Sequence, residues 1–402
     1  MMAADFIKRY RLDPVYIDGQ RCIEALMKDM KSGLEGLGTI PMNPSYLSLD
    51  ITPRHGVPCC IMDAGGTNLR TASAVFQDDG QCILSDFSKT SMLGMEQELS
   101  FREFYNQLAA YAHRTGHPEL VGFCFSYNVE HNRNLDGILQ SWCKEIRVPD
   151  AVGKPVGQSL CNAIGAECQK VHVVNDSTAA LLGAHHRSNS VSIGVILGTG
   201  INICYGEKCK NIPKVPENLL SESMIISTEI GEFQGIPKTI FDASVIAESD
   251  EPEMAHAEKQ CSGAYLGNLI SKAWAQAAEE GILDISFRKG ASLPEISSYL
   301  SGQECAIPPC PSAKIIAQTM IHRAAKIAAI LTAGVILFRH RAGDVCTMVI
   351  EGSQFDKLTG FAAAYTAELA SLLKPYQIGF QIFQAENNCL IGAALAAFAE
   401  PM

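Results

Sequence analysis

The sequence predicts an α/β fold with two lobes, and three observations support this prediction. The chain has 402 residues, which is more than a single hydrophobic core usually organises. Strand-like and helix-like segments alternate along it, a pattern typical of α/β architecture. The segments 59–76 and 191–205 also share one design, in which a turn of Gly and Thr joins two apolar strands. We therefore expect two related lobes, each opening with a β-hairpin.

The hydrophobic pattern predicts the individual elements in chain order. A mostly helical segment at 4–34, broken at Asp13-Pro14, precedes a turn-rich connector. We then expect strands at 59–62, 68–76, 81–87, 120–125, 171–174 and 191–197, a strand ending at 205, and strands at 345–350 and 378–383. Helices are expected at 101–115, 155–168, 177–186, 355–373 and 389–398. The helix at 177–186 is expected to begin with Asp176 or Ser177 as its N-cap.

The stretch between 205 and 341 is expected to be mainly helical. Its longest apolar run, 327–338, is too short to cross a bilayer. That run continues a periodic pattern from Ala313 that includes charged residues. A long helix buried on one face therefore explains it better than a membrane span.

Charge and cysteine content narrow the function classes. The formal net charge is −11, which disfavours nucleic acid and anionic membranes as partners. An anionic nucleotide would then need local devices: backbone N–H groups, a few basic side chains and a metal ion. The 15 cysteines are scattered and partly lie in apolar runs, so we expect reduced, mostly buried thiols in a cytoplasmic protein. The sequence gives no prediction of oligomeric state.

Asp63-Ala64-Gly65-Gly66-Thr67-Asn68 is the first candidate phosphate-binding turn. A carboxylate ends an apolar strand, and two glycines then let the backbone approach a phosphate closely and adopt positive φ. Asp63 would hold Mg²⁺ through water molecules, because this ion usually keeps part of its hydration shell. An ordinary hairpin turn is the alternative interpretation.

Gly198-Thr199-Gly200 supplies a second turn of the same kind, and a nucleotide held between two lobes needs a contact from each.

Asn175-Asp176 follows another apolar strand and begins a helix. A plain N-cap is the commoner role for such a carboxylate. Phosphoryl transfer also needs a group that accepts the proton of the attacking hydroxyl, and Asp176 is the candidate for that general base.

Eight segments, in family order from about residue 40 to 398, resemble the hexokinase family. Asp63–Arg70 (D-A-G-G-T-N-L-R) and 196–205 (I-L-G-T-G-I-N-I-C-Y) resemble its two phosphate motifs. The others are P-S-Y at 44–46, F-C-F-S-Y at 123–127 with G-I-L-Q-S-W-C-K at 137–144, N-D-S at 175–177, S-T-E-I-G at 227–231, E-K-Q-C-S-G-A-Y-L-G at 258–267 and E-G-S at 351–353.

The resemblance implies a two-lobed actin-like ATPase (ribonuclease H-like) fold, with a cleft between a small and a large domain. It places the small domain at 59–175 plus 386–402 and the large domain at 1–58 plus 176–385. It implies an ATP-dependent hexose kinase that uses Mg²⁺ and phosphorylates the 6-hydroxyl of a hexose such as glucose.

Residue roles also follow from the resemblance. Asp176 and Lys144 are the implied catalytic residues. The implied hexose-binding residues are Ser126, Cys143, Lys144, Asn175, Asp176, Asn202, Glu229 and Glu258. The implied nucleotide-binding residues are Asp63, Gly65, Gly66, Thr67, Asn68, Arg70, Gly198, Thr199, Gly200, Gly352 and Ser353, with Asp63 as the metal-binding residue.

Five positions depart from the family pattern, and most lie in the sugar-binding segments. Asn128 replaces Pro, Cys143 replaces Thr, Ser227 replaces Asn, Ile230 replaces Trp, and Glu351 replaces Asp. The altered sugar shell leaves the preferred hexose open. It also supports an alternative, a catalytically weak hexose-sensing regulator on the same fold. A sugar-independent ATPase is a third possibility, although such a protein would not need the W-C-K loop or Glu258.

Overall fold

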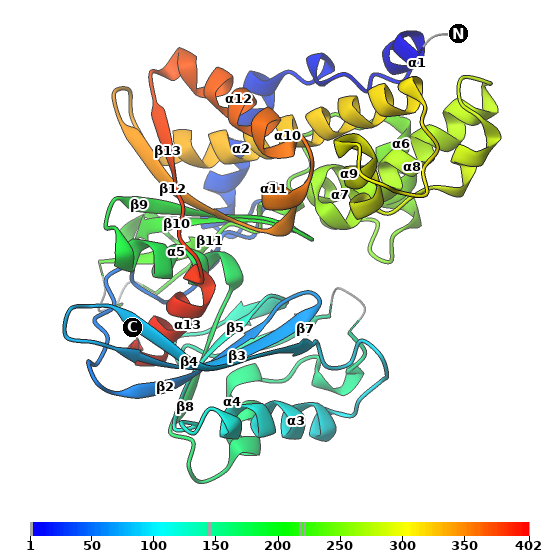
Figure 1. The fold of residues 1–402 in the computed structure, drawn as a ribbon. Coiled ribbons are helices and arrows are strands. Elements are labelled where there is room, and N and C mark those ends of the chain that lie inside the picture. Colours follow the sequence, from blue (N-terminus) through cyan, green and yellow to red (C-terminus); the bar gives the residue numbers. More distant parts are fainter. Residues whose placement is uncertain (1–2, 143–145, 217–218, 220–221, 402) are drawn as a thin grey trace.

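The computed structural model describes residues 3–142, 146–216, 219 and 222–401. Within these residues the strands form a six-stranded sheet, a five-stranded sheet and a two-stranded ribbon. We call the part built on the five-stranded sheet the small lobe and the part built on the six-stranded sheet the large lobe (Figure 1). The sequence-based boundaries between the two lobes stay a prediction.

Both sheets follow one topology, which explains the internal repeat in the sequence. Each begins with an antiparallel hairpin, adds a third antiparallel strand beside the hairpin's second strand, and adds two parallel strands beside its first. In spatial order the small-lobe strands are β4 (Cys82–Ser91), β3 (Asn68–Phe76), β2 (Pro58–Ala64), β5 (Leu120–Phe125) and β8 (Lys170–Val174). The corresponding large-lobe strands are β11 (Ser223–Ser227), β10 (Ile201–Lys208), β9 (Val191–Leu197), β12 (Val345–Glu351) and β13 (Gly379–Phe383).

Helices cover both faces of the small-lobe sheet. Along β2, Cys60 and Met62 pack with α3 (Phe101–Arg114) and α4 (Val156–Ile164). Cys59 and Ile61 point to the opposite face and pack with α13 (Asn388–Phe398). Burial on both faces explains why these strands read as continuous apolar runs instead of alternating ones.

Helices α5 (Asp176–Arg187) and α13 pack against each other between the two sheets (Figure 1). α5 also contacts β9 of the large lobe, whereas α13 contacts β2, β5 and β8 of the small lobe. The helices approach at backbone distance: a Cβ placed on Gly392 of α13 would lie 1.8 Å from the carbonyl oxygen of Ala179 in α5. Position 392 therefore has room for glycine alone, because any side chain would collide with α5. The two lobes meet through this helix pair.

The large-lobe sheet is covered on its other side by the long helix α10 (Pro311–Arg339). Among the described residues α10 is the helix long and apolar enough to cross a membrane, but 83% of its most apolar window is buried inside the protein, as in a core helix. The predicted long helix is confirmed, although its second half is buried all round instead of on one face.

The remaining helices complete the large lobe and its connections. α2 (Gly19–Leu34) and α12 (Phe361–Leu373) pack on α10. The others are α1 (Ala3–Arg9), α6 (Ile240–Glu248), α7 (His256–Cys261), α8 (Gly263–Glu279), α9 (Leu293–Ser301) and α11 (Ser353–Lys357). The short strand β1 (Asn43–Pro44) pairs with β11, and β6 (Asn128–His131) pairs with β7 (Gly137–Ser141).

Four sequence-based expectations need correction. The N-cap of α5 is Asn175, whose Oδ1 accepts from the Ser177 amide, while Asp176 is already helical. The segment expected to be mainly helical contains strand β11. The β6–β7 ribbon was not predicted. The expected helix at 355–373 is two helices, α11 and α12, because the chain turns at Gly360 in the left-handed region with φ 87°.

Candidate active site

The first hairpin turn carries a buried carboxylate at its base. Asp63, near the end of β2, is 3% exposed, and its Oδ2 accepts from the Arg70 Nε of the neighbouring strand at 2.6 Å. The Arg70 Nη2 contacts the same oxygen. Burial raises the pKa of the Asp63 carboxyl, and the Arg70 charge opposes that shift. The ion pair leaves the second carboxylate oxygen, Oδ1, unused by Arg70.

The turn itself presents its polar groups outward. Gly66 and Thr67 form the bend, Thr67 is exposed, and Asn68 Nδ2 donates to Thr67 Oγ1 at 2.7 Å. The Gly65 amide donates to the Asn68 carbonyl oxygen at 3.0 Å, which closes the turn. Gly65 does not adopt positive φ, so the expected conformational reason for glycine here is wrong. The remaining expected reason for glycine in this turn is that it lets a ligand approach the backbone closely.

The second turn is held by the start of α8. Gly198 N donates to Gly200 O at 3.0 Å within the turn, and Gly263 N and Ala264 N donate to the carbonyl oxygens of Gly198 and Thr199. These two α8 amides belong to the first turn of a helix, where N–H groups lack intrahelical partners. Thr199 is exposed at the tip, as Thr67 is in the first turn. The two turns are thus matched in exposure as well as in sequence.

Gly352 brings the end of β12 against this second turn. Its φ is 131°, and a Cβ at this position would lie 2.3 Å from the Leu197 carbonyl oxygen and 2.8 Å from Gly198 N. Ser353 follows as the first residue of α11. Because β9 and β12 are parallel neighbours, their carboxyl ends meet at one sheet edge. The predicted nucleotide-binding residues Gly198, Gly352 and Ser353 are therefore brought together.

We expect Gly352→Ala to weaken nucleotide binding by at least tenfold, because the added methyl group must push the 197–199 backbone out of place. Its backbone strain of about 1–3 kcal/mol should also lower the Tm. Gly360→Ala is the matched control, since Gly360 also has positive φ (87°) but has nothing within 4 Å of the added Cβ. Equal effects of both variants on nucleotide binding would contradict a role of Gly352 in shaping the turn.

Asp176 lies at the start of α5, next to the N-cap Asn175. Its Oδ1 accepts from the Ser177 amide at 2.8 Å, and both Asn175 and Asp176 are partly exposed. Asn175 Oδ1 accepts from both the amide and the hydroxyl of Ser177, at 2.9 and 2.7 Å. The helix start thus fixes both side chains while leaving them reachable from solvent.

Asn202, Ser227 and Glu229 form a second polar cluster on the large lobe. Asn202 Nδ2 donates to Ser227 Oγ at 2.9 Å and to Glu229 Oε1 at 2.8 Å. Asn202 Oδ1 accepts from the Glu229 amide at 3.0 Å. Glu229 adopts a left-handed backbone with φ 55° and ψ 47°, which is rare for a residue other than glycine. Such strain persists only where surrounding contacts impose it, and it often marks a functional site.

Glu258, in α7, reaches the start of β10. Its Oε2 accepts from the Ile201 amide at 3.0 Å, and a Cβ on Gly200 would lie 2.5 Å from the same oxygen. Glycine at 200 therefore makes room for this carboxylate. Glu258 is partly exposed, so the structure places it beside the second turn and within reach of a ligand there.

The charge of Asp176, at the start of α5, acts on two carboxyl groups from other elements, Asp63 and Glu229. Burial is the main cause that raises the pKa of both Asp63 and Glu229, and the charge of Asp176 adds to the shift in each case. Asp176 is thus close enough to interact with the first phosphate turn on one side and with the Asn202–Glu229 cluster on the other. That arrangement suits transfer of a phosphoryl group between a nucleotide and a hydroxyl compound.

Two family models, both described as Hexokinase, match this chain, one over residues 4–186 and the other over residues 192–399. The second alone covers just over half of the chain. The chain belongs to the hexokinase family.

Curated relatives agree with this assignment. The chain is 32% identical over 281 residues to hexokinase-2, chloroplastic, of Nicotiana tabacum, covering 64% of this chain and 56% of the relative. It is 30% identical over 285 residues to hexokinase-2 of Candida albicans, covering 64% and 58%. The matches therefore span little more than half the length of these hexokinases.

Solved structures confirm the two-lobed fold. The Schistosoma mansoni hexokinase complexed with glucose has a TM-score of 0.83 at 20% identity, covering 98% of each chain. A glucokinase of the ROK family from Streptomyces griseus, in complex with glucose and AMPPNP, has a TM-score of 0.54 at 18% identity and covers 84% of this chain and 98% of its own.

Two of the predicted site residues, Cys143 and Lys144, lie outside the described residues. Neighbouring positions are described. The Ser126 amide donates to Ala64 O at 3.1 Å, and the Tyr127 hydroxyl donates to Gly65 O at 2.8 Å. The small-lobe sugar segment is therefore attached directly to the first phosphate turn.

Sequence reasoning gave no functional role to Cys389. Cys389 Sγ donates to Glu351 Oε2 at 3.2 Å and lies 3.7 Å from the Asp176 carbonyl oxygen, so it joins the end of β12 to the start of α5. The other oxygen, Oε1 of Glu351, is buried without a hydrogen-bond partner among the described residues. Neither contact has a local sequence signal, because each depends on segments far apart in the chain.

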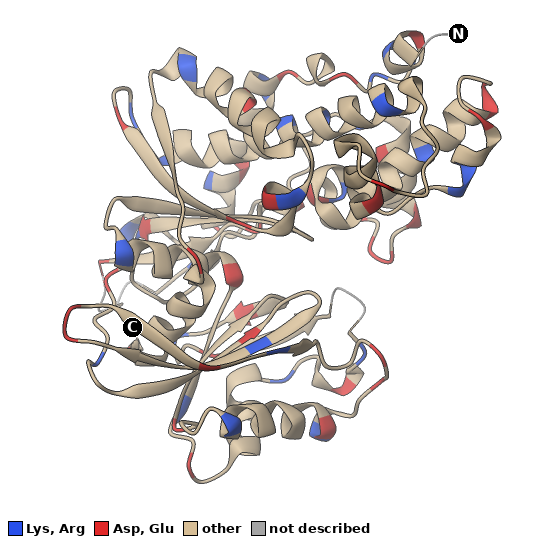
Figure 2. Ribbon diagram, in the orientation of Figure 1, with Lys and Arg blue, Asp and Glu red and all other residues tan. Residues whose placement is uncertain are grey.

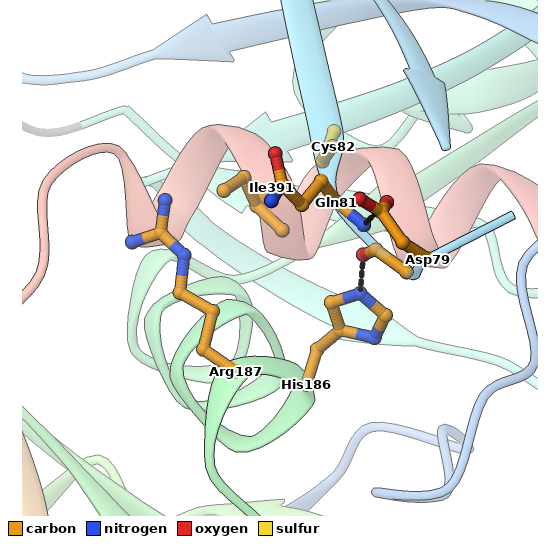
Figure 3. A pocket seen from close by; sticks show the side chains of 7 residues that line it. Asp79, Gln81, Cys82, His186, Arg187 and Ile391 are labelled. Carbon is orange, nitrogen blue, oxygen red and sulfur yellow. Dashed lines mark hydrogen bonds between the residues drawn. The ribbon is translucent and has the colours of Figure 1, made fainter. Parts of the chain in front are cut away.

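A pocket of about 470 Å³ lies away from the hexokinase-type site, at the opposite end of α5 (Figure 3). It is lined by His186, Arg187, the β3–β4 turn 79–82 and Ile391 of α13, and His186 Nε2 contacts Gly80 O at 2.8 Å. His186 is ten residues beyond Asp176, about 15 Å along the helix axis. The pocket therefore belongs to the junction of the lobes.

Proposed function

We propose that this chain is an ATP-dependent hexose kinase that transfers the γ-phosphoryl group of ATP to the 6-hydroxyl of a hexose such as glucose. The observation that carries the proposal is that the charge of Asp176 acts both on Asp63, at the base of the first turn, and on Glu229, while the neighbouring Ser177 hydroxyl lies 3.5 Å from Ser227 in the Asn202–Glu229 cluster. Membership of the hexokinase family supports it. Glucose and AMPPNP are the ligands named for solved structures of similar fold.

In the proposed reaction, one set of residues binds the hexose, Asp176 accepts a proton and Lys144 stabilises charge. The hexose hydroxyls are held by Asn202, Glu229 and Glu258 of the large-lobe side, together with Ser126, Lys144 and Asn175 of the small-lobe side. Asp176 accepts the proton of the hexose 6-hydroxyl while the oxygen of that hydroxyl forms the new bond to the γ-phosphorus. The bond from the γ-phosphorus to the β,γ-bridging oxygen breaks, and ADP leaves with that oxygen. Lys144 stabilises charge on the transferring group.

The residues present suit a magnesium ion beside the first turn. Mg²⁺ prefers carboxylate oxygens and keeps part of its water shell. Asp63 Oδ1 is not used by Arg70, and Glu351 Oε1 is a buried carboxylate oxygen without a partner among the described residues. When bound, Mg²⁺ would neutralise charge on the β- and γ-phosphates. Asp63 would hold it, while the turn residues Gly65 to Asn68, Arg70, and the second turn at 198–200 would orient the phosphates.

A coupled assay for ADP release, run with and without a panel of hexoses, tests the proposal. Hexose-dependent turnover is expected. Hexose binding without turnover would instead favour the hexose-sensing regulator, which the altered sugar shell supports. Turnover independent of any hexose would favour the sugar-free ATPase. The panel also determines the preferred hexose, which the departures at Asn128, Cys143, Ser227 and Ile230 leave open.

A hexose should also change tryptophan emission in the absence of ATP. Trp142 packs against Tyr127, with ring centroids 5.0 Å apart, and Tyr127 is bonded to the first turn. A ligand that contacts both lobes favours a closed arrangement and should alter the surroundings of Trp142. Trp274 is 1% exposed in the large-lobe core. Trp142→Phe should therefore abolish most of the emission change, and Trp274→Phe should not; the reverse pattern would contradict closure around Trp142.

Location and further partners are part of the proposal. All fourteen cysteines in the described part of the chain carry free thiols, which suits a reducing compartment such as the cytoplasm. Figure 2 shows Lys and Arg interspersed with Asp and Glu over both lobes. This distribution and the net charge of −11 support small-molecule substrates instead of nucleic acid or an anionic membrane.

A further inference from the structure

The hydroxyl of Ser227 lies at the centre of the large-lobe polar cluster. It accepts from Asn202 Nδ2 at 2.9 Å and donates to Glu229 Oε1 at 2.8 Å. On its other side, Ser177 Oγ of α5 is 3.5 Å away. Ser227 is 2% exposed and Ser177 is fully buried. Because solvent does not reach these hydroxyls, their hydrogen bonds are set by the protein groups around them.

The direction of each bond follows from which atoms carry protons. An amide nitrogen only donates and an ionised carboxylate only accepts, so the single hydroxyl proton of Ser227 must point to Glu229. The Ser177 proton is already taken, because Asn175 Oδ1 lies 2.7 Å away and can only accept. The two hydroxyl oxygens then share no proton, which agrees with their 3.5 Å separation. The Ser227 hydroxyl therefore donates its proton to the ionised carboxylate of Glu229.

Glu229 depends on these contacts for its orientation. Its left-handed backbone is fixed by the bond from its amide to Asn202 Oδ1. Its Oε1 is held by Asn202 and Ser227, while no hydrogen bond from the described residues reaches Oε2. One carboxylate oxygen is therefore bound to the protein and the other is left for a ligand.

We propose that Ser227 is a positioning residue for hexose binding, whose hydroxyl fixes Oε1 of Glu229 so that Oε2 accepts a hydrogen bond from a sugar hydroxyl. This inference rests on the proposed function. It concerns a position at which the chain departs from the family pattern, which has Asn there. Burial raises the pKa of the Glu229 carboxyl, and the bonds from Ser227 and Asn202 oppose that shift. Ser227 therefore also helps to keep Glu229 ionised beside the Asp176 charge.

Ser227→Ala should raise the KM for hexose about tenfold and change kcat by less than about threefold, since a hydrogen bond to a charged group is lost from the binding site. The ionised form of Glu229 is the form that binds. Losing a donor to that form raises its pKa, so binding should fail at a higher pH. We expect the acid limb of kcat/KM for hexose to move up by about one pH unit. Ser227→Thr, which keeps the hydroxyl, should restore both values.

Thr228→Val is the matched control. Thr228 is the next residue and is fully buried, but its hydroxyl donates to the Ile203 carbonyl oxygen at 2.6 Å instead of to Glu229. It should lower the Tm and leave the acid limb in place. If Ser227→Ala does not fold, Ser227→Cys, with its weaker donor, should give a smaller shift in the same direction.

The outcomes separate this inference from the function on which it rests. A wild-type protein without hexose-dependent turnover would overturn the proposed function. A wild-type protein that phosphorylates hexose, combined with an unmoved acid limb in the Ser227 variants, would overturn the positioning role alone. An equal shift in Thr228→Val would also overturn it, because the effect would then come from packing in this strand.

Discussion

Replacing Asp176 with Asn is expected to lower kcat by about 10²–10⁴-fold, the usual contribution of a general base. Asn has nearly the same shape and can still accept the hydrogen bond that the Ser177 amide donates to Asp176 Oδ1 at 2.8 Å. It cannot take the proton of the attacking hydroxyl. The start of α5 should therefore stay intact, and hexose affinity should change by only a few-fold.

Steady-state kinetics with a saturating hexose measure the loss in kcat, and Trp142 emission measures hexose affinity in the same variant. Asp176→Ala serves as a comparison, because it removes the bond to Ser177 as well as the base. Near-normal turnover in Asp176→Asn would show that another group accepts the proton. A large loss of affinity with normal kcat would assign Asp176 to binding alone.

Replacing Asp63 with Asn should lower kcat by about 10²–10³-fold, comparable to the loss of one preorganised electrostatic group. The Mg²⁺ concentration needed for half-maximal rate should rise. The physical reason is the loss of the carboxylate that would hold the ion next to the phosphates, while Arg70 keeps an amide oxygen as partner. Hexose binding, measured by Trp142 emission without ATP, should change little.

Asp78→Asn is the matched control for this experiment. Asp78 lies in the turn that follows the same hairpin, its side chain is fully exposed, and its contact with His55 is 3.6 Å long. The same chemical change there should leave the Mg²⁺ titration unaltered. Identical titrations for wild type and Asp63→Asn would refute the metal role of Asp63.

Much of the fold was predictable because the central strands of both sheets are buried on both faces. Continuous apolar runs such as 120–125 and 191–197 coincide with β5 and β9. The repeat between the two hairpins was visible in sequence because both turns need small and hydroxyl-bearing residues. β11 was missed because S-M-I-I-S is too short an apolar run to distinguish a strand from a helix. The segment is a strand because it pairs with β10.

Candidate site residues could be predicted where they lie in a motif, whereas residues that support another residue could not. Asp63, Asp176, Asn202 and Glu229 lie in motifs, so the resemblance located them. The bond from Cys389 to Glu351 and the approach of Ser177 to Ser227 join segments far apart in sequence. Such contacts follow from how α5, β11, β12 and α13 pack, which no local pattern contains. The N-cap of α5 was assigned one or two residues too late, as is common at helix ends.

The placement of α13 has a consequence for how the protein is made. This helix covers one face of the small-lobe sheet, whose strands come from residues 58–174, but it is itself formed by residues 388–398. A ribosome adds about 5–20 residues per second, so Cys59, Ile61 and Cys124 are synthesised roughly 13–66 seconds before the helix that buries them. During synthesis the whole large-lobe sheet is completed before the small lobe can close its second face. Nascent chains paused before residue 388 should therefore bind chaperones that recognise exposed apolar strands, and release of the pause should end that binding.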